Sequence, residues 1–468
     1  MFARNQDFNI CLATDSYKVS HAWQYPPGTE TVYSYFESRG GMEPKILWFG
    51  LQYYLKKYLT GPIVDPKKIE EAEAIYAQHF GKALFNKEGW TYIWEKHKGH
   101  LPIKIKSAPE GTLIDTQNVL MTVENTDPRC YWLTSWLETL LSKVWYPATV
   151  ATRSYSIKAL VQKFLEKTGG IEGLDFKLHD FGYRGVSSEE SAGIGGAAHL
   201  INFKGTDTVA ALVLIRQYYG LDEGIAGFSI PASEHSTMTA WGREGEEKAF
   251  LNMLEKFPEG HVAVVSDSYD IYKACSEIWG ERLKEKVLNR KGTLVIRPDS
   301  GKPEEVTLSV LRILGEKFGT NINSKGYREL DPHVRIILGD GVNRDSIARI
   351  LEIMEKETWS ASNLTFGAGA ALLQKLDRDT HKFAFKCSAL KQDENWRDVF
   401  KAPITDPGKS SKPGRLILNR QEDGTYITKK ISPHSEAAQK AQDLLETVFL
   451  NGVLIKDTSF TEIRNRAQ

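Results

Sequence analysis

The sequence predicts an α/β protein that combines a β/α barrel with a second, α+β domain. The main observation is a set of short apolar runs, each ending in an acid, a glycine or an arginine and followed by polar or helical sequence: FKLHD, GFSIPASEH, VAVVSD, LVIRPD, VRIILGD and LTFGAG. Apolar runs that alternate with helices are typical of βα units with parallel strands. The chain has 468 residues, whereas single hydrophobic cores stop growing at roughly 250–300 residues, so a second domain is expected.

The barrel is expected over residues 148–385, where these runs lie. Their number, with GTD as a further short junction, suits a closed or partly closed barrel better than an open sheet. Outside this region the pattern is mixed. Stretches such as LPIKIKSAPEG alternate apolar and polar residues as half-buried strands do, and a helix is predicted near 437–450. We therefore expect residues 1–147 and 386–468 to form the α+β domain together.

Composition argues against several classes of protein. With 60 basic and 60 acidic residues the net charge is zero, so the chain shows no electrostatic footprint for nucleic acid or an anionic membrane. No run of about 18 apolar residues occurs, and the N-terminus lacks the apolar segment of a signal peptide. The cysteines are far apart and form no CxxC pattern, which argues against a zinc site or a disulfide framework. The sequence predicts a cytoplasmic protein with no membrane or nucleic-acid partner and no metal held by protein ligands alone.

One stretch, residues 177–207, carries an unusual concentration of polar and aromatic groups at a predicted strand-to-helix junction. The run FKLHD is followed by the turn FGYRG and then by a helix start with capping-box spacing from Ser187 to Glu190. Phe181 and Arg184 fall at this junction, where α/β proteins expose side chains and backbone N–H groups to ligands. The same pattern also suits a plain connection between strand and helix.

Two later junctions carry groups suited to phosphate and sugar. Arg297 and Asp299 lie in IRPDSG, and Asp267 lies in VSDSYD. An arginine offers a planar fork to phosphate oxygens, and paired acids can hold sugar hydroxyls or hydrated Mg²⁺. A structural Asp–Arg pair at the end of the barrel would show the same spacing.

Two glycine-containing junctions end the last two predicted barrel strands. Gly339 and Asp340 belong to GDG, and Gly369 belongs to FGAGA. Glycines let backbone N–H groups approach an anion closely, although simple tight turns use the same residues.

Taken together, the motifs HDFGYRGVSS, TDSYKVSH, GTDT, SEHST, VSDSYD, IRPDSG and GDGV resemble those of type II phosphoribosyltransferases that use nicotinamide. The resemblance runs from about Asn9 nearly to the C-terminus, with the motifs in family order. It implies a type II phosphoribosyltransferase-like barrel. It also implies transfer of the phosphoribosyl group of phosphoribosyl pyrophosphate to nicotinamide, giving nicotinamide mononucleotide and pyrophosphate in NAD salvage.

The resemblance further implies how the base is bound. Phe181 would cover one face of nicotinamide, and Tyr17 would cover the other face from the neighbouring subunit of a homodimer with shared active sites. Asp207 would face the amide, although its position before an apolar helical run also suits a helix N-cap.

For the phosphates, the resemblance implies Arg297 at pyrophosphate, with Asp267 and Asp299 facing ribose or metal and Arg184 adding charge. Mg²⁺ would be bound mainly through the substrate phosphates. The 5′-phosphate would be bound by the two glycine-containing loops, through Gly339, Asp340 and Gly369, with Arg378 close by. This chain has Ala370 where the family usually has glycine.

His235, in SIPASEHST, matches a histidine that the family phosphorylates from ATP, so ATP is expected as a coupled substrate. A lone histidine at a strand end also suits a simple polar contact. Two other functions stay open: the sister reaction on nicotinate, and a catalytically idle homologue that binds nucleotides. Arg297, Asp299, Asp267 and His235 occur together as the predicted catalytic set, which argues against idleness.

Overall fold

The computed structural model describes residues 8–432 and 443–468 of the chain. The chain divides into two compact units. The first unit comprises Met1–Thr152, Leu214–Glu223 and Leu376–Gln468, and the second comprises Arg153–Val213 and Gly224–Lys375. The division expected from the sequence, 148–385 against the rest, runs close to this one but does not set Leu214–Glu223 apart.

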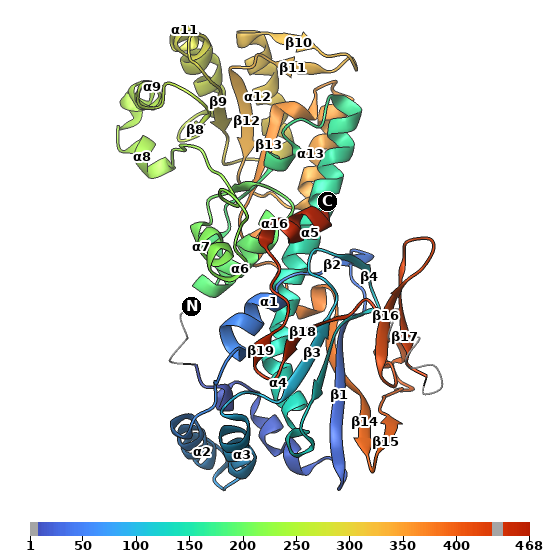
Figure 1. Cartoon of the computed structure of the whole chain (residues 1–468). Helices are drawn as coiled ribbons and strands as arrows, with labels where there is room; N and C mark the ends of the chain where they lie inside the picture. The colour runs from blue at the N-terminus through green and yellow to red at the C-terminus, as the bar shows by residue number, and fades with distance from the viewer. Residues whose placement is uncertain (1–7, 433–442) are drawn as a thin grey trace. The chain divides into compact units, whose positions relative to one another are not determined.

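The second unit is built on a six-stranded parallel sheet (Figure 1). Its strands are short and apolar because both faces of a parallel sheet are covered; VAVV, for example, is buried at every position. In spatial order the strands are β7 (Gly205–Thr206), β6 (Leu178–Asp180), β13 (Leu364–Ala368), β12 (Val334–Leu338), β9 (Leu294–Arg297) and β8 (Val262–Val265).

The two edges of this sheet are joined through residues 228–233. Isolated parallel bridges pair Gly205 with Phe228 and Ala232 with Ala263, and the Ser233 N–H donates to the Ala263 carbonyl at 3.0 Å. Pro231 lies between the two bridges and has no N–H to donate, which explains why this stretch is not a regular strand. The predicted β/α barrel is confirmed, in a partly closed form.

Side chains fill the barrel, and helices follow its strands. Ala263, Val295 and Ile337 form a buried cluster, against which Phe181 and Ile230 pack, as expected for a barrel interior that is a packed core. The helices of this unit include α6 (Glu189–Leu200), α8 (His235–Thr239), α9 (Glu246–Lys256), α11 (Lys284–Leu288), α12 (Pro303–Phe318), α13 (Arg344–Lys356) and α14 (Ala370–Leu373).

The start of α6 differs from the prediction by one residue. Ser188 has an extended backbone, and its hydroxyl accepts the Ser191 N–H at 3.1 Å. Ser188 is therefore the N-cap, and the predicted capping box from Ser187 to Glu190 is wrong.

The first unit contains a seven-stranded sheet with antiparallel pairing, to which both ends of the chain contribute. Strand β14 pairs with β1, and β18 pairs with β3. This confirms the predicted α+β domain made from the N- and C-terminal parts. The strand order is β15 (Asn395–Asp398), β14 (Phe383–Gln392), β1 (Thr29–Ser38), β5 (Val119–Asn125), β3 (Ile103–Ser107), β18 (Glu446–Leu450) and β19 (Val453–Leu454).

Among the described residues, the helices that lie wholly within the first unit are α1 (Leu51–Tyr54), α2 (Pro66–Phe80), α3 (Lys87–His97), α4 (Leu133–Leu141) and α16 (Phe460–Ala467). Strand β2 (Lys45–Leu47) pairs antiparallel with β4 (Leu113–Asp115), and β16 (Leu416–Arg420) forms a hairpin with β17 (Tyr426–Lys430). The helix predicted near 437–450 is wrong for the residues that the structure describes. Its residues 437–442 lie outside the described residues, and Glu446–Leu450 is a strand.

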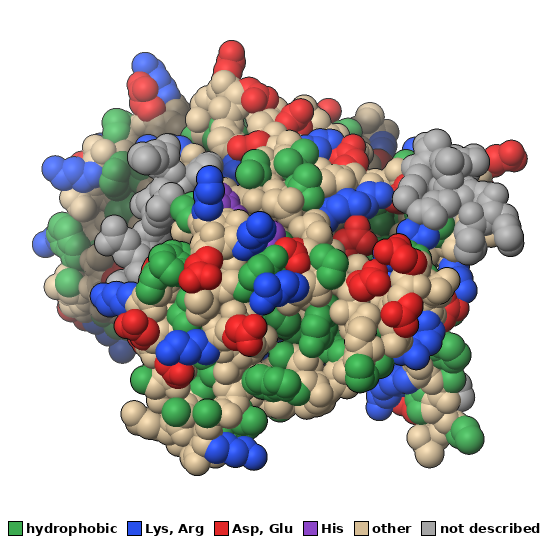
Figure 2. Space-filling view, turned by 60° about the horizontal axis from the view of Figure 1, so that its bottom comes forward, with side chains coloured by type: hydrophobic (Ala, Val, Ile, Leu, Met, Phe, Trp, Pro, Cys, Tyr) green, Lys and Arg blue, Asp and Glu red, His purple; other side chains and the backbone are tan. Residues whose placement is uncertain are grey.

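Helix α5 (Trp145–Thr168) runs from one unit into the other and holds Pro147 in its first turn, where a proline is tolerated because the first N–H groups of a helix have no partner within it. In the described part of the chain, none of the helices combines the length and apolar character that a bilayer crossing requires. On the face drawn in Figure 2, basic and acidic side chains are interspersed.

Candidate active site

A cavity of about 870 Å³ lies at the carboxyl ends of the barrel strands in the second unit, the end at which barrel enzymes place their chemistry. It brings together eight of the residues predicted from the sequence. Its lining consists of Phe181, Tyr183, Arg184, Val186, Ser187, Ser188, Glu189, Asp207, Arg297, Asp299, Gly339, Asp340 and Gly369.

Phe181 lies between the barrel core and this cavity. Its ring packs against the buried cluster of the barrel and also lines the cavity. The ring lies over Gly367: a Cβ at that position would come within 2.0 Å of the Phe181 Cε2 atom. The Phe181 N–H donates to the Ala368 carbonyl at 2.9 Å, which ties the residue to the neighbouring strand. A glycine at position 367 is therefore what lets an aromatic ring form part of the cavity wall.

This contact predicts that Gly367→Ala destabilises the protein through Phe181. An added methyl group would overpack the site and cost about 1–3 kcal/mol, and each kcal/mol lowers the melting temperature of a unit of this size by roughly 2–4 °C. The double variant Gly367→Ala/Phe181→Leu should lose less stability than the sum of the two single variants, because leucine leaves room for the methyl group. Thermal unfolding of the four proteins measures this; strictly additive losses would show that the ring does not depend on Gly367.

Asp207 follows β7 and faces polar partners from two other segments. Its Oδ1 atom accepts from His179 Nε2 at 2.8 Å and from Ser229 Oγ at 2.5 Å. Burial alone would raise the pKa of Asp207, but the hydrogen bonds from His179 and Ser229 and the charge of Arg297 hold it below the usual value. The carboxylate is therefore ionised, and its hydrogen bonds run to these two residues, whereas a helix-capping role would direct them to the start of α7 (Val209–Tyr218).

Sequence reasoning missed His179 and Ser229. A signal was available for His179, because residues two apart in a strand share a face and Phe181 follows at that spacing.

Asp180 is a third missed residue, buried at the end of β6. Burial raises the pKa of Asp180 to about 6, against the lowering effect of the Gly182 N–H, which donates to its Oδ1 at 2.7 Å. This bond holds the turn that follows Phe181.

His235 and Asp267 form a pair beside the cavity. His235 begins α8, and its Nε2 lies 3.0 Å from Asp267 Oδ1, while its Nδ1 lies 3.9 Å from Asp299 Oδ2. Asp267 Oδ2 accepts the Asp299 N–H at 2.9 Å and the Ser300 hydroxyl at 2.6 Å. Burial would raise the pKa of Asp267, but these donors and His235 lower it. A buried carboxylate thus holds His235 by Nε2; Ser300 was not anticipated from the sequence.

Arg297 ends β9 and lines the cavity together with Asp299. The contact between Arg297 Nη2 and Asp299 Oδ2 is loose, at 3.6 Å. Arg297 Nε is buried and has no hydrogen-bond partner among the described residues. A buried donor of this kind usually has a partner, so an anion in the cavity fits this guanidinium better than a purely structural Asp–Arg pair does.

The glycine loops after β12 and β13 also reach the cavity, through Gly339 and Gly369. Ala370 begins the four-residue helix α14. Its methyl group packs against the turn that carries Arg184: a Cβ placed on Gly185 would lie 3.2 Å from the Ala370 Cβ. The methyl group is therefore accommodated by a glycine in the facing turn.

Two predicted residues belong to the first unit. Tyr17 lies on the 3₁₀ helix Ser16–Trp23 and is 62% exposed, with the Lys18 Nζ atom 5.3 Å from its ring centroid. Arg378 begins the short helix Arg378–Thr380 and contacts Asp379 Oδ1 at 3.3 Å.

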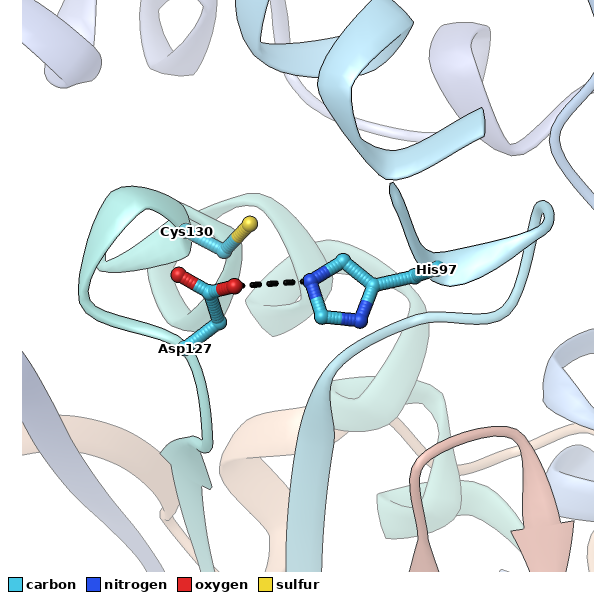
Figure 3. Close-up of side chains that lie close together, drawn as sticks. All are labelled: His97, Asp127 and Cys130. Atoms are coloured by element: carbon cyan, nitrogen blue, oxygen red, sulfur yellow. Dashed lines mark hydrogen bonds and ion pairs between the residues drawn. The ribbon is translucent and has the colours of Figure 1, made fainter. Parts of the chain in front are cut away.

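The first unit also contains a cluster of His97, Asp127 and Cys130 (Figure 3), the one group in the described part of the chain with three closely spaced potential metal ligands. Asp127 already accepts from His97 Nε2 at 2.8 Å, from the Tyr92 hydroxyl at 2.9 Å and from the Arg129 N–H at 2.9 Å. Burial raises the pKa of the Cys130 thiol to about 12, which leaves it protonated. Asp127 is the N-cap of the short helix Pro128–Cys130, and this role explains why the three side chains lie close together.

The chain is similar to known proteins over nearly its whole length. Residues 176–453 match the nicotinate phosphoribosyltransferase (NAPRTase) family, and residues 9–105 match the nicotinamide phosphoribosyltransferase N-terminal domain. The chain is 50% identical to a nicotinamide phosphoribosyltransferase of Xanthomonas campestris pv. campestris, with 98% of each chain covered. It is 33% identical to the protein of the same name from Acinetobacter baylyi, with 98% of this chain and 97% of that protein covered.

Two solved structures share the fold. A nicotinate-nucleotide pyrophosphorylase from Pyrococcus furiosus matches with a TM-score of 0.62 at 15% identity, covering 100% of this chain and 96% of the other. Human nicotinic acid phosphoribosyltransferase matches with a TM-score of 0.52 at 15% identity, covering 98% and 93%. The sequence matches, which extend over nearly the whole chain, show that it belongs to the nicotinate phosphoribosyltransferase family and, within it, to the nicotinamide phosphoribosyltransferases.

Proposed function

We propose that this chain transfers the phosphoribosyl group of phosphoribosyl pyrophosphate to nicotinamide, giving nicotinamide mononucleotide and pyrophosphate in NAD salvage. The observation that carries the proposal is that one cavity holds an aromatic wall and an ionised acid, Phe181 and Asp207, together with Arg297 and Asp299. The relatives named nicotinamide phosphoribosyltransferase, one of them 50% identical, support it.

The reaction needs positioning and charge stabilisation, not a protein nucleophile. The pyridine nitrogen forms a bond to the ribose C1 atom while the bond from C1 to pyrophosphate breaks, and positive charge develops on the sugar. Arg297 would bind the departing pyrophosphate, and Asp299 would face the cationic sugar. Preorganised charges of this kind act strongly in a site from which water is excluded.

Asp207 favours nicotinamide over nicotinate, the second candidate substrate. Its ionised carboxylate can accept an N–H of the amide, whereas it would repel the carboxylate of nicotinate. Phe181 offers its ring to the pyridine, and offset stacking adds roughly 0.5–1.5 kcal/mol beyond burial.

The 5′-phosphate and Mg²⁺ fit the remaining groups of the cavity. The half-buried Gly339 and Gly369 line it without side chains, and Arg184 adds positive charge. Asp299 and Asp340 supply the hard oxygen ligands that Mg²⁺ prefers, whereas both oxygens of Asp267 are occupied by His235, Ser300 and the Asp299 N–H. Mg²⁺, when bound with the substrate, would neutralise charge on the pyrophosphate.

We further propose that ATP phosphorylates His235. With Nε2 donating to Asp267, Nδ1 keeps a lone pair that can attack the γ-phosphorus of ATP; a P–N bond forms and the P–O bond to ADP breaks. Water later cleaves the P–N bond and releases phosphate, so ATP hydrolysis is coupled to transfer without being part of its atom balance.

The proposed assembly is a homodimer in which Tyr17 of one subunit closes the base site of the other. The 62% exposure of this aromatic residue supports a role in contact with a second chain.

The proposed location is the cytoplasm. All four cysteines are free, which fits a reducing compartment.

Subunit sharing predicts complementation between two inactive variants. If Phe181→Ala and Tyr17→Ala chains exchange subunits, half of the dimers are mixed and one site of each mixed dimer is intact, so about a quarter of wild-type activity should return. Each variant mixed with itself is the control. Failure to recover activity after exchange has been demonstrated by mass would place Tyr17 outside the site.

The proposed function is tested by incubating the purified chain with phosphoribosyl pyrophosphate, Mg²⁺ and ATP and with either nicotinamide or nicotinate. Nicotinamide mononucleotide and pyrophosphate should form in equal amounts, and nicotinate should react more slowly. Transfer to nicotinate alone, or to neither base, would overturn the proposal.

A further inference from the structure

We propose that His179 is a positioning residue of the base site, which orients Asp207 and Phe181 together and thereby sets the preference for the amide over the acid. This inference rests on the proposed function. His179 contacts both residues: its Nε2 lies 2.8 Å from Asp207 Oδ1, and its ring centroid lies 5.0 Å from that of Phe181. Its side chain is only 13% exposed, so it is enclosed by these neighbours.

The register of the barrel explains how one histidine reaches both residues. His179 lies on β6 and is paired with Gly205 on β7. A Cβ at Gly205 would lie 2.8 Å from His179 Nδ1, so the absence of a side chain there leaves room for the imidazole over β7. Asp207 comes two residues after Gly205, where the Nε2 atom of His179 contacts it. Phe181 comes two residues after His179, just beyond the end of β6.

The hydrogen bonds assign the proton of the imidazole. An ionised carboxylate only accepts hydrogen bonds, so Nε2 of His179 carries the hydrogen that it shares with Asp207; this tautomer follows from the network. Ser229 Oγ donates to the same oxygen, Oδ1, at 2.5 Å. Two donors on Oδ1 fix the plane of the carboxylate and leave Oδ2 to accept the N–H of the amide.

His179 acts through Asp207 and Phe181, which line the cavity, and is not itself one of the lining residues. Its loss should therefore weaken binding and discrimination of the base and leave the use of phosphoribosyl pyrophosphate unchanged. A residue that only stabilised the fold would affect both substrates alike.

Two substitutions separate the two contacts. His179→Gln places an amide N–H near the position of Nε2 and removes the ring, whereas His179→Phe keeps a ring beside Phe181 and removes the donor to Asp207. A matched control is His333→Asn, at a histidine of the same unit whose Nδ1 lies 2.7 Å from Asp331 Oδ1 outside the cavity.

The experiment measures KM for nicotinamide, KM for phosphoribosyl pyrophosphate and the ratio of kcat/KM for nicotinamide to that for nicotinate. For His179→Phe we expect KM for nicotinamide to rise about tenfold or more and the ratio to fall by a similar factor, as for loss of a hydrogen bond to a charged group. KM for phosphoribosyl pyrophosphate should stay within about twofold. His179→Gln should retain most of the selectivity, and His333→Asn should match the wild type.

An unchanged ratio in His179→Phe, or equal rises in both KM values, would overturn the positioning role while leaving the proposed function intact. If the wild-type chain itself makes no nicotinamide mononucleotide, the proposed function fails and this inference fails with it.

Discussion

Arg297→Ala is expected to lower kcat/KM for phosphoribosyl pyrophosphate by about a hundredfold to a thousandfold, the usual effect of removing one preorganised donor from developing negative charge. Arg297 lines the cavity, and its buried Nε has no hydrogen-bond partner among the described residues. Its contact with Asp299 is loose, at 3.6 Å, so the substitution removes a group that we propose binds pyrophosphate and breaks no tight ion pair.

Steady-state kinetics with phosphoribosyl pyrophosphate varied at saturating nicotinamide measures this effect. Arg297→Lys should lower kcat/KM for phosphoribosyl pyrophosphate less than Arg297→Ala does, because an ammonium keeps the charge but not the planar fork. Arg312→Ala is a suitable control, since Arg312 is an exposed residue that pairs with Glu357 at 2.8 Å. A loss confined to the melting temperature would mean that Arg297 only supports the barrel.

His235→Ala is expected to abolish ATP hydrolysis that depends on the base and to remove all stimulation of transfer by ATP. Slow basal transfer should remain, because the cavity still positions both substrates. Asp267→Asn should weaken ATP coupling less severely, since an amide still contacts Nε2 but no longer favours the tautomer with a free Nδ1.

Coupled assays of ADP and pyrophosphate release, with and without ATP, measure both effects. His261→Ala, at an exposed histidine just before β8, provides a control of the same residue type. Full ATP stimulation in His235→Ala would contradict phosphorylation at this histidine.

Much of the barrel could be predicted because its strands are short apolar runs that end in polar residues. Parallel strands end at one edge, so Phe181, Arg297 and Gly339 had to lie near one another once the runs were recognised. The glycines that admit the Phe181 ring and the His179 imidazole could not be assigned, because Gly367 and Gly205 act across strands whose register is set only by the folded sheet.

Hydrogen bonds between residues far apart in the chain also could not be predicted from the sequence. His179 and Ser229 reach Asp207 from 28 and 22 residues away, and no local pattern indicates such bonds. The strand at Glu446–Leu450 was predicted as part of a helix, although ETVFL is rich in residues that favour strands; pairing with β3 decides its structure.

The central claim, that Asp207 selects nicotinamide, is tested most directly by the ratio of kcat/KM for nicotinamide to that for nicotinate in the wild type and in Asp207→Asn. A hydrogen bond to a charged group contributes roughly 1.5–3 kcal/mol, so the wild-type ratio should owe about tenfold to a hundredfold to this carboxylate. Asp207→Asn should weaken the use of nicotinamide and bring the ratio down by that factor, with thermal unfolding as the control for a loss of stability. An unchanged ratio in Asp207→Asn would contradict the account and place selectivity elsewhere in the cavity.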